Sequence, residues 1–167
     1  MRHRYLILGL LLEHPMTGYA LHQKMQTLVE TIASTSYGTL YPLLHKLLAA
    51  GEVSMEVLPG RGRAPKKQYR ITAAGETALR QWLSVPLTLD SHQDFLLRLY
   101  LAQHLTPDDL NALISQRRCI LVMQIDQLEA TITATSGEVM LQRYLISSSQ
   151  MELAWLQQMD VPELQLG

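Results

Sequence analysis

The stretch "SYGTLYPLLHKLLAAG", residues 36–51, has the leucine spacing of an amphipathic helix but begins with residues that disfavour one. At about 100° per residue its leucines fall on one side of a helix, and Gly51 predicts where that helix ends. A proline and a glycine near the start reduce helix stability. The need to bury the leucines therefore does not explain why these two residues are present. The opposite side is small, polar and cationic, and it comprises Gly38, Thr39, Pro42, His45, Lys46 and Ala49, with Tyr41 at its edge.

Two short helices are predicted before this stretch. They lie near residues 3–13 and 17–30, and Pro15 separates them because proline disfavours helix in the residue that precedes it. Thr17 is a suitable N-cap for the second helix. The sequence therefore begins with three short helices joined by tight turns.

A hairpin follows the third helix, because apolar and polar residues alternate in residues 53–57 (VSMEV) and 68–71 (QYRI). The loop between these strands, residues 58–66 (LPGRGRAPK), is longer than the usual roughly two to five residues and contains no acid. Long loops are commonly functional. A helix near residues 73–83, capped by Thr72, completes this part of the chain.

This order of elements is that of a winged helix-turn-helix, in which the third helix enters the DNA major groove and the hairpin contacts the neighbouring backbone or minor groove. Hydroxyl and amine side chains contact phosphates and base edges, so the weak start of the third helix suits a DNA duplex. The predicted fold is mainly α (α+β): a winged helix-turn-helix with a two-stranded β-hairpin wing over residues 1–84, then an α-helical dimerisation region over residues 85–167.

The second part begins after residues 84–93 (SVPLTLDSHQ), which we interpret as a boundary. We expect a helix over residues 92–104, then a long helix opened by Thr106 as its cap. A last helix is predicted after a break near residue 136. These three helices make up the predicted dimerisation region.

We predict a homodimer, because these helices carry more apolar surface than so small a half can cover. Arg117 lies on the same stripe, where an internal core would not favour a charge. A monomeric helical hairpin, with Arg117 reaching towards solvent, is the alternative. The predicted dimer contacts are Leu110, Ile114, Arg117, Leu121, Ile125, Leu128, Leu145 and Trp155.

The net charge of −1 hides an uneven distribution along the chain. Residues 1–84 contain ten Lys and Arg against five Glu, a net charge of +5, whereas residues 85–167 have a net charge of −6. This asymmetry indicates that the first part meets a polyanion, with chance drift of surface charge as the alternative. No apolar run is long enough to cross a bilayer, so we expect a cytoplasmic protein with no membrane partner.

No enzyme class is indicated by the motifs. The six histidines form no HExxH motif, and no glycine-rich phosphate loop follows a strand. The single Cys119 is expected to be a buried, inert thiol. We expect no catalytic residue, metal or cofactor. The remaining rival is a winged-helix protein-interaction module that does not bind DNA, which the acid-free basic loop disfavours.

Three blocks, "TGYAL", "SYGTLYPLLHKLLAAG" and "KKQYRITAAGETAL", resemble the PadR family of bacterial transcriptional regulators over roughly residues 5–83. The resemblance implies a sequence-specific homodimeric repressor, often released from DNA by a small molecule. Glu52 departs from the family, in which an aliphatic residue usually follows the glycine. By motif position the resemblance places ten residues at the DNA: Tyr19, Ser36, Tyr37, Thr39, Tyr41, Lys46, Arg61, Arg63, Lys66 and Lys67.

From these features we expect the operator to be an inverted repeat, with half-sites about one helical turn apart. Thr39, Tyr41 and Lys46 are expected to read bases from a rigid helix, and the cations of the wing to contact phosphates. An effector, if there is one, is expected in the helical region or at its junction with the winged helix. The sequence identifies neither the operator nor the effector.

Overall fold

The computed structural model describes residues 2–29, 37–59, 65–89 and 92–159. The chain forms two compact units, and each is described by itself below. The first, here called the winged-helix unit, comprises Met1–Val85 and Leu96–His104; the second, the helical unit, comprises Pro86–Phe95 and Leu105–Gly167.

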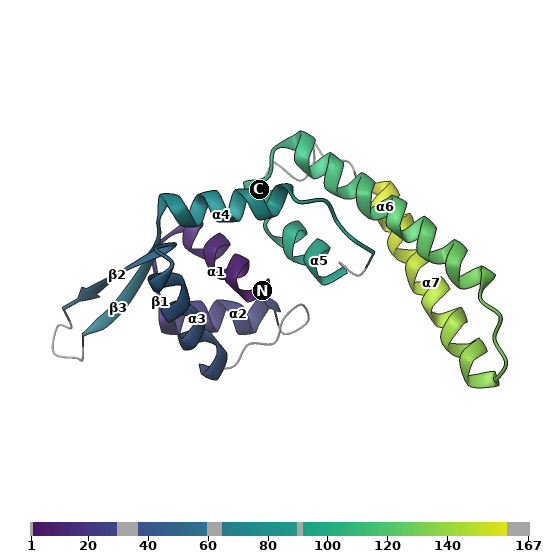
Figure 1. The fold of residues 1–167 in the computed structure, drawn as a ribbon, viewed down its shortest axis with the longest axis horizontal. Helices are drawn as coiled ribbons and strands as arrows, with labels where there is room; N and C mark the ends of the chain where they lie inside the picture. The colour runs from purple at the N-terminus through teal and green to yellow at the C-terminus, as the bar shows by residue number, and fades with distance from the viewer. Residues whose placement is uncertain (1, 30–36, 60–64, 90–91, 160–167) are drawn as a thin grey trace. The chain divides into compact units, whose positions relative to one another are not determined.

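The winged-helix unit contains the predicted order of helices and strands (Figure 1). The predicted mainly helical α+β fold with an N-terminal winged helix-turn-helix is confirmed. Up to Val85 its elements are α1 (Arg2–Glu13), β1 (Met16–Thr17), α2 (Gly18–Val29), α3 (Tyr37–Ala49), β2 (Val53–Leu58), β3 (Lys66–Ile71) and α4 (Ala73–Ser84).

The wing is part of a three-stranded antiparallel sheet, with the strand order β1-β3-β2. The predicted hairpin of β2 and β3 is present, but the short strand β1 is additional. Met16 pairs with Tyr69 and Thr17 with Gln68. A strand of two residues has no periodicity to detect, so only its pairing with β3 reveals it.

The core of this unit is built from leucines of several helices. In α3, Leu40, Leu44 and Leu47 are at most 2% exposed, which confirms the inner side of the predicted wheel. Helix α3 ends in a Schellman motif, because Gly51 adopts φ 70° and the Glu52 N–H bonds to the Leu47 carbonyl at 3.0 Å. This turn directs the chain into the wing.

A tight joint connects the wing to α4. Thr72 is the N-cap, as predicted: its hydroxyl accepts from the Gly75 N–H at 3.2 Å and donates to the Gly51 carbonyl at 2.6 Å. A Cβ on Gly75 would overlap the carbonyl oxygen of Glu52. Glycine is therefore required where α4 passes the turn that ends α3.

The predicted helix over residues 92–104 is interrupted: α5 (His92–Tyr100) is followed by a separate 3₁₀ turn, Ala102–His104. Helix α6 (Pro107–Ala130) is capped by Thr106 as predicted. Helix α7 (Ser136–Gln158) begins with a capping box in which Glu138 accepts hydrogen bonds from Ala134 and Thr135, and these lower the pKa of its carboxyl group.

Within the helical unit, α6 and α7 pack side by side (Figure 1). Several predicted dimer residues lie inside this chain: Leu110, Ile114, Arg117, Leu121 and Ile125 are at most 9% exposed, and Leu128 is half-buried. Only Leu145 and Trp155 of that set are exposed. Residues buried in one chain are not available to a partner, so the stripe of α6 is used internally.

Arg117 has an internal partner, in contrast to the expectation that its charge favours an interface. Its Nε and Nη2 atoms donate to the two carboxylate oxygens of Glu152 at 2.7 and 2.8 Å. Cys119 was expected to be buried but is exposed, because it lies on the outer side of α6. No helix in the described ranges is long and apolar enough to cross a membrane.

Candidate nucleic-acid interface

The outward face of α3 is exposed along its length. Gly38, Thr39, Pro42, His45, Lys46 and Ala49 are all exposed, and Tyr41 is 40% exposed at the edge of this face. The predicted geometry of the face is therefore confirmed. Since the leucines on the other side are buried, α3 presents these side chains from a rigid support.

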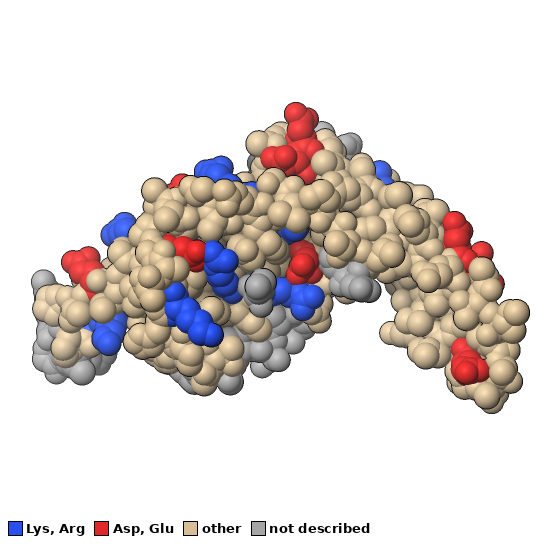
Figure 2. All heavy atoms as spheres, in the orientation of Figure 1, with Lys and Arg blue, Asp and Glu red and all other residues tan. Residues whose placement is uncertain are grey.

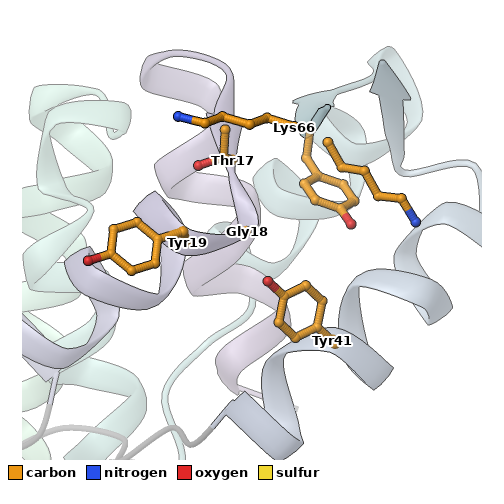
Figure 3. A pocket seen from close by; sticks show the side chains of 7 residues that line it. Thr17, Gly18, Tyr19, Tyr41 and Lys66 are labelled. Atoms are coloured by element: carbon orange, nitrogen blue, oxygen red, sulfur yellow. The ribbon is translucent and has the colours of Figure 1, made fainter. Parts of the chain in front are cut away.

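A hollow of about 420 Å³ borders this face on the Tyr41 side (Figure 3). We call it the wing-side hollow. Four elements converge on it: β1, the start of α2, the first half of α3 and β3. Its lining residues are Thr17, Gly18, Tyr19, Tyr41, Lys66, Lys67 and Tyr69.

Hydroxyl and amine groups lie at the rim of the wing-side hollow. Tyr19 is 59% exposed and accepts a hydrogen bond from Gln23 Nε2 at 2.8 Å. Figure 3 shows the Tyr41 hydroxyl directed towards Gly18, and the Lys66 side chain extended over Thr17. Such groups donate hydrogen bonds to phosphate oxygens, so this rim suits a nucleic-acid backbone.

Tyr69 forms the inner wall of the hollow and is 3% exposed. Burial is the larger cause that raises the pKa of its phenol above the ordinary value of 10.0, and the nearby Tyr41 raises this pKa further. The phenol therefore stays protonated near neutral pH and keeps its capacity to donate a hydrogen bond. Lys66 and Lys67, at the start of the same strand, are exposed.

Gly18 is a site residue that the sequence analysis missed. A Cβ on it would lie 3.0 Å from the Tyr41 hydroxyl oxygen and 3.1 Å from Cε1. The Tyr41 ring therefore packs against the bare backbone at the start of α2. The "TGYAL" block contains this glycine, but only the contact between α2 and α3 explains why a side chain is absent there.

Three predicted DNA-contacting residues, Ser36, Arg61 and Arg63, lie outside the described residues. Tyr37 is the first residue of α3. The structure brings Tyr19, Tyr41, Lys66 and Lys67 to one hollow, and it places Thr39 and Lys46 on the opposite flank of α3.

Glu52, the departure from the family pattern, is held by an ion pair with Arg4 of α1. Arg4 Nε donates to Glu52 Oε2 at 2.8 Å, and Arg4 Nη2 contacts Oε1. This hydrogen bond, partly offset by desolvation, raises the pKa of Arg4. The ion pair neutralises a carboxylate that is only 9% exposed at the base of the wing.

Charge is distributed unevenly over the face drawn in Figure 2. Lys and Arg atoms gather over the part formed by α1–α4 and the sheet, whereas Asp and Glu atoms predominate over α6 and α7. This agrees with the charge asymmetry of the sequence. The winged-helix unit is therefore the cationic part of the molecule.

Family models match the two parts of the chain separately. Residues 7–81 match the transcriptional regulator PadR-like family, and residues 92–160 match the virulence activator alpha C-term model. A PadR-like transcription factor from Bacteroides fragilis is 32% identical over 47% of this chain and 73% of its own, with a TM-score of 0.42. This chain belongs to the PadR-like transcriptional regulator family. PadR-like proteins are regulators and not enzymes, which confirms the expectation of no catalytic activity.

Two further relatives are similar over more of this PadR-like chain. The negative transcriptional regulator PadR from Bacillus subtilis (strain 168) is 25% identical over 116 residues, which span 68% of this chain but only 64% of that relative. The structure of smu.1604c from Streptococcus mutans UA159 is 26% identical, covers 94% of this chain and 97% of its own, and has a TM-score of 0.50.

Bacillus subtilis PadR has been crystallised with two kinds of ligand. The complex with operator DNA matches at 20% identity over 94% of this chain and 96% of its own, with a TM-score of 0.49. The complex with p-coumaric acid matches at 21% identity over 94% of this chain and 95% of its own, with a TM-score of 0.48.

Among the residues described for the present PadR-like chain, no cluster of three or more His, Cys, Asp or Glu could hold a metal ion.

Proposed function

We propose that this chain is a homodimeric repressor that binds an inverted-repeat operator in double-stranded DNA. Residues 1–84 are the proposed DNA-binding domain and residues 85–167 the dimerisation domain. The observation that carries the proposal is the exposed outward face of α3, next to the exposed lysines of the wing. A rigid helix with such a face suits the major groove, and the wing suits the adjacent backbone.

The proposal assigns different roles to α3 and the wing. Thr39 and Tyr41 lie on a helix backed by buried leucines, so they can hold a register against base edges. Cations at the wing contact phosphates and release counterions, which does not depend on sequence. The full proposed set of DNA-contacting residues is Tyr19, Ser36, Tyr37, Thr39, Tyr41, Lys46, Arg61, Arg63, Lys66 and Lys67.

Titration of variants against DNA separates these roles. The two probes are a duplex recovered by selecting bound fragments from genomic DNA, and a scrambled duplex of equal length and composition. The double variant Lys66→Ala/Lys67→Ala should weaken binding to both duplexes alike, and reduce the log–log salt slope by about 0.9 for each phosphate that is no longer neutralised. Thr39→Val should cost about 1–3 kcal/mol on the selected duplex and relax the preference at one position of each half-site.

Arg80→Ala is the control for loss of a cation, because Arg80 is exposed on α4 and Figure 1 shows α1 between α4 and α3. The two roles would be the reverse of those proposed if the wing variant lost its sequence preference and the Thr39 variant changed only the salt dependence. If the wild-type protein bound neither duplex, the winged helix would be a protein-interaction module instead.

The dimer part of the proposal rests on an exposed apolar stripe of α7. At about 100° per residue its members fall on one side of the helix. Each of them is 49–73% exposed: Met140, Leu141, Tyr144, Met151 and Trp155. Monomeric proteins rarely leave such a continuous apolar surface in water, so we propose that a second copy of the chain covers it.

Tyr144→Lys/Met151→Lys should dissociate the dimer, because charges would replace apolar side chains in the proposed contact. Sedimentation equilibrium should show a dissociation constant raised at least about 100-fold. The matched control is Gln150→Lys/Gln157→Lys, which adds the same charge at the same spacing on another side of α7, where both glutamines are exposed. A wild-type monomer at micromolar concentration, or equal dissociation by both pairs, would contradict the proposed stripe.

The sign of regulation and the effector are also part of the proposal. We propose repression because the Bacillus subtilis relative is named a negative transcriptional regulator. Release from DNA by a small molecule follows the complex of that relative with p-coumaric acid. A ligand can release the DNA only if it binds the non-binding conformation of the dimer more tightly.

A further inference from the structure

A second hollow borders the outward face of α3, on the flank away from Tyr41. It has a volume of about 370 Å³, and its walls include His3 and Arg4 of α1 and Thr39 and Lys46 of α3. We call it the α1-side hollow. At about 100° per residue, Tyr41 lies on one flank of the exposed face and Thr39 and Lys46 on the other. The two hollows therefore lie on opposite sides of that face.

The first turn of α1 carries charges that oppose the helix dipole. Arg2 and Arg4 lie at the positive end of a 12-residue helix, and no acid lies in its first turn. Cations at this end reduce helix stability. Such a local conflict is expected where function requires it. The Glu52 carboxylate already balances Arg4, and an anion in the hollow would balance the turn further.

The polar groups of the α1-side hollow also favour an anion. Glu52, the carboxylate bound by Arg4, is already neutralised by that ion pair. His3 Nε2 is buried and has no hydrogen-bond partner among the residues with described positions. A buried polar atom without a partner costs free energy. If the His3 ring, which lines the hollow, turns Nε2–H into it, a ligand oxygen there provides the missing acceptor.

We propose that the α1-side hollow binds a phosphate of the DNA backbone through His3 and Lys46. The inference rests on the proposed function and adds a contact to it: α1 holds one strand of the duplex while the wing holds the other. A helix in the major groove, which is about 12 Å wide, lies between two backbones. Contacts on both flanks therefore centre α3 in the groove, and Lys46 serves the backbone instead of base edges.

Titration of His3 variants of the full-length protein tests this assignment, with the selected and scrambled duplexes as probes. His3→Ala should weaken binding to both duplexes by the same factor, about tenfold, because a hydrogen bond to a charged phosphate is removed. His3→Gln keeps an N–H donor and should lose less. Arg80→Ala, which removes a cation from α4, should change the affinity less than twofold.

A methylphosphonate scan identifies the contacted phosphate, since each substitution removes one backbone charge. At one position in each half-site, a methylphosphonate should weaken binding by the wild type. The same methylphosphonate should not weaken binding by the His3→Ala variant any further, because that variant has already lost the contact. Unchanged affinity of His3→Ala, or a loss confined to the selected duplex, would overturn the inference while leaving the proposed function intact. If His3→Ala failed to fold, His3→Gln and Lys46→Gln would be scanned in its place. Absence of DNA binding by the wild type would overturn both proposals.

Discussion

Replacing Glu152 with alanine is expected to lower the free energy of unfolding by about 3–5 kcal/mol, because it leaves a buried guanidinium without its counterion. Arg117 is 3% exposed, and both of its hydrogen bonds to Glu152 are shorter than 2.9 Å. His92 Nδ1 lies 2.6 Å from Arg117 Nη2, and the guanidinium lies 5.5 Å from the centre of the Phe95 ring. Glu152 therefore supplies the negative charge that balances the guanidinium.

Urea denaturation at a fixed protein concentration measures this effect, since dissociation of an oligomer would otherwise shift the transition. Glu129→Ala is the control, because Glu129 is exposed on α6 and its loss should change the free energy of unfolding by less than about 0.5 kcal/mol. The double variant Arg117→Met/Glu152→Leu should recover most of the loss, because it removes both buried charges. A loss below about 1 kcal/mol for Glu152→Ala would show that the ion pair does not stabilise the helical unit.

Replacing Gly75 with alanine is expected to destabilise the winged-helix unit by about 2–3 kcal/mol through overpacking. The new methyl group would overlap the carbonyl oxygen of Glu52 and lie 2.8 Å from Ile71 Cγ1. That carbonyl accepts a hydrogen bond from the Thr72 N–H at 3.0 Å. Backbone atoms cannot rotate away as a side chain can, so the joint between α4 and the wing must shift.

Gly137→Ala is the matched control for Gly75→Ala. A Cβ on Gly137 meets no other atom within 4 Å, and this glycine lies in the first turn of α7. Alanine there should therefore stabilise the helix by up to about 1 kcal/mol. In thermal unfolding measured by circular dichroism, the midpoint temperature should fall for Gly75→Ala and rise for Gly137→Ala. A stability change of the same sign and size in both would exclude the proposed overlap at Gly75.

Local patterns in the sequence determined most of the winged helix. The leucines of residues 37–50 specify which side of α3 is buried, because a helix repeats every 3.6 residues whatever it packs against. Thr72 and Thr106 were predicted as caps from their positions before apolar helices, and both accept hydrogen bonds from the first turn. Since the same wheel exposes Thr39 and Lys46, the outward face of α3 was predictable from the sequence as well.

Contacts between distant residues were decided only by the tertiary structure. Strand β1 exists because Met16 and Thr17 lie beside β3, and Gly18 matters because Tyr41 packs against it. Arg117 resembled an interface residue because its partner Glu152 follows 35 residues later, on another helix. Periodicity shows which side of a helix is apolar but not which surface covers it. For that reason the burial of the α6 stripe within one chain, and the exposure of the α7 stripe, followed from packing alone.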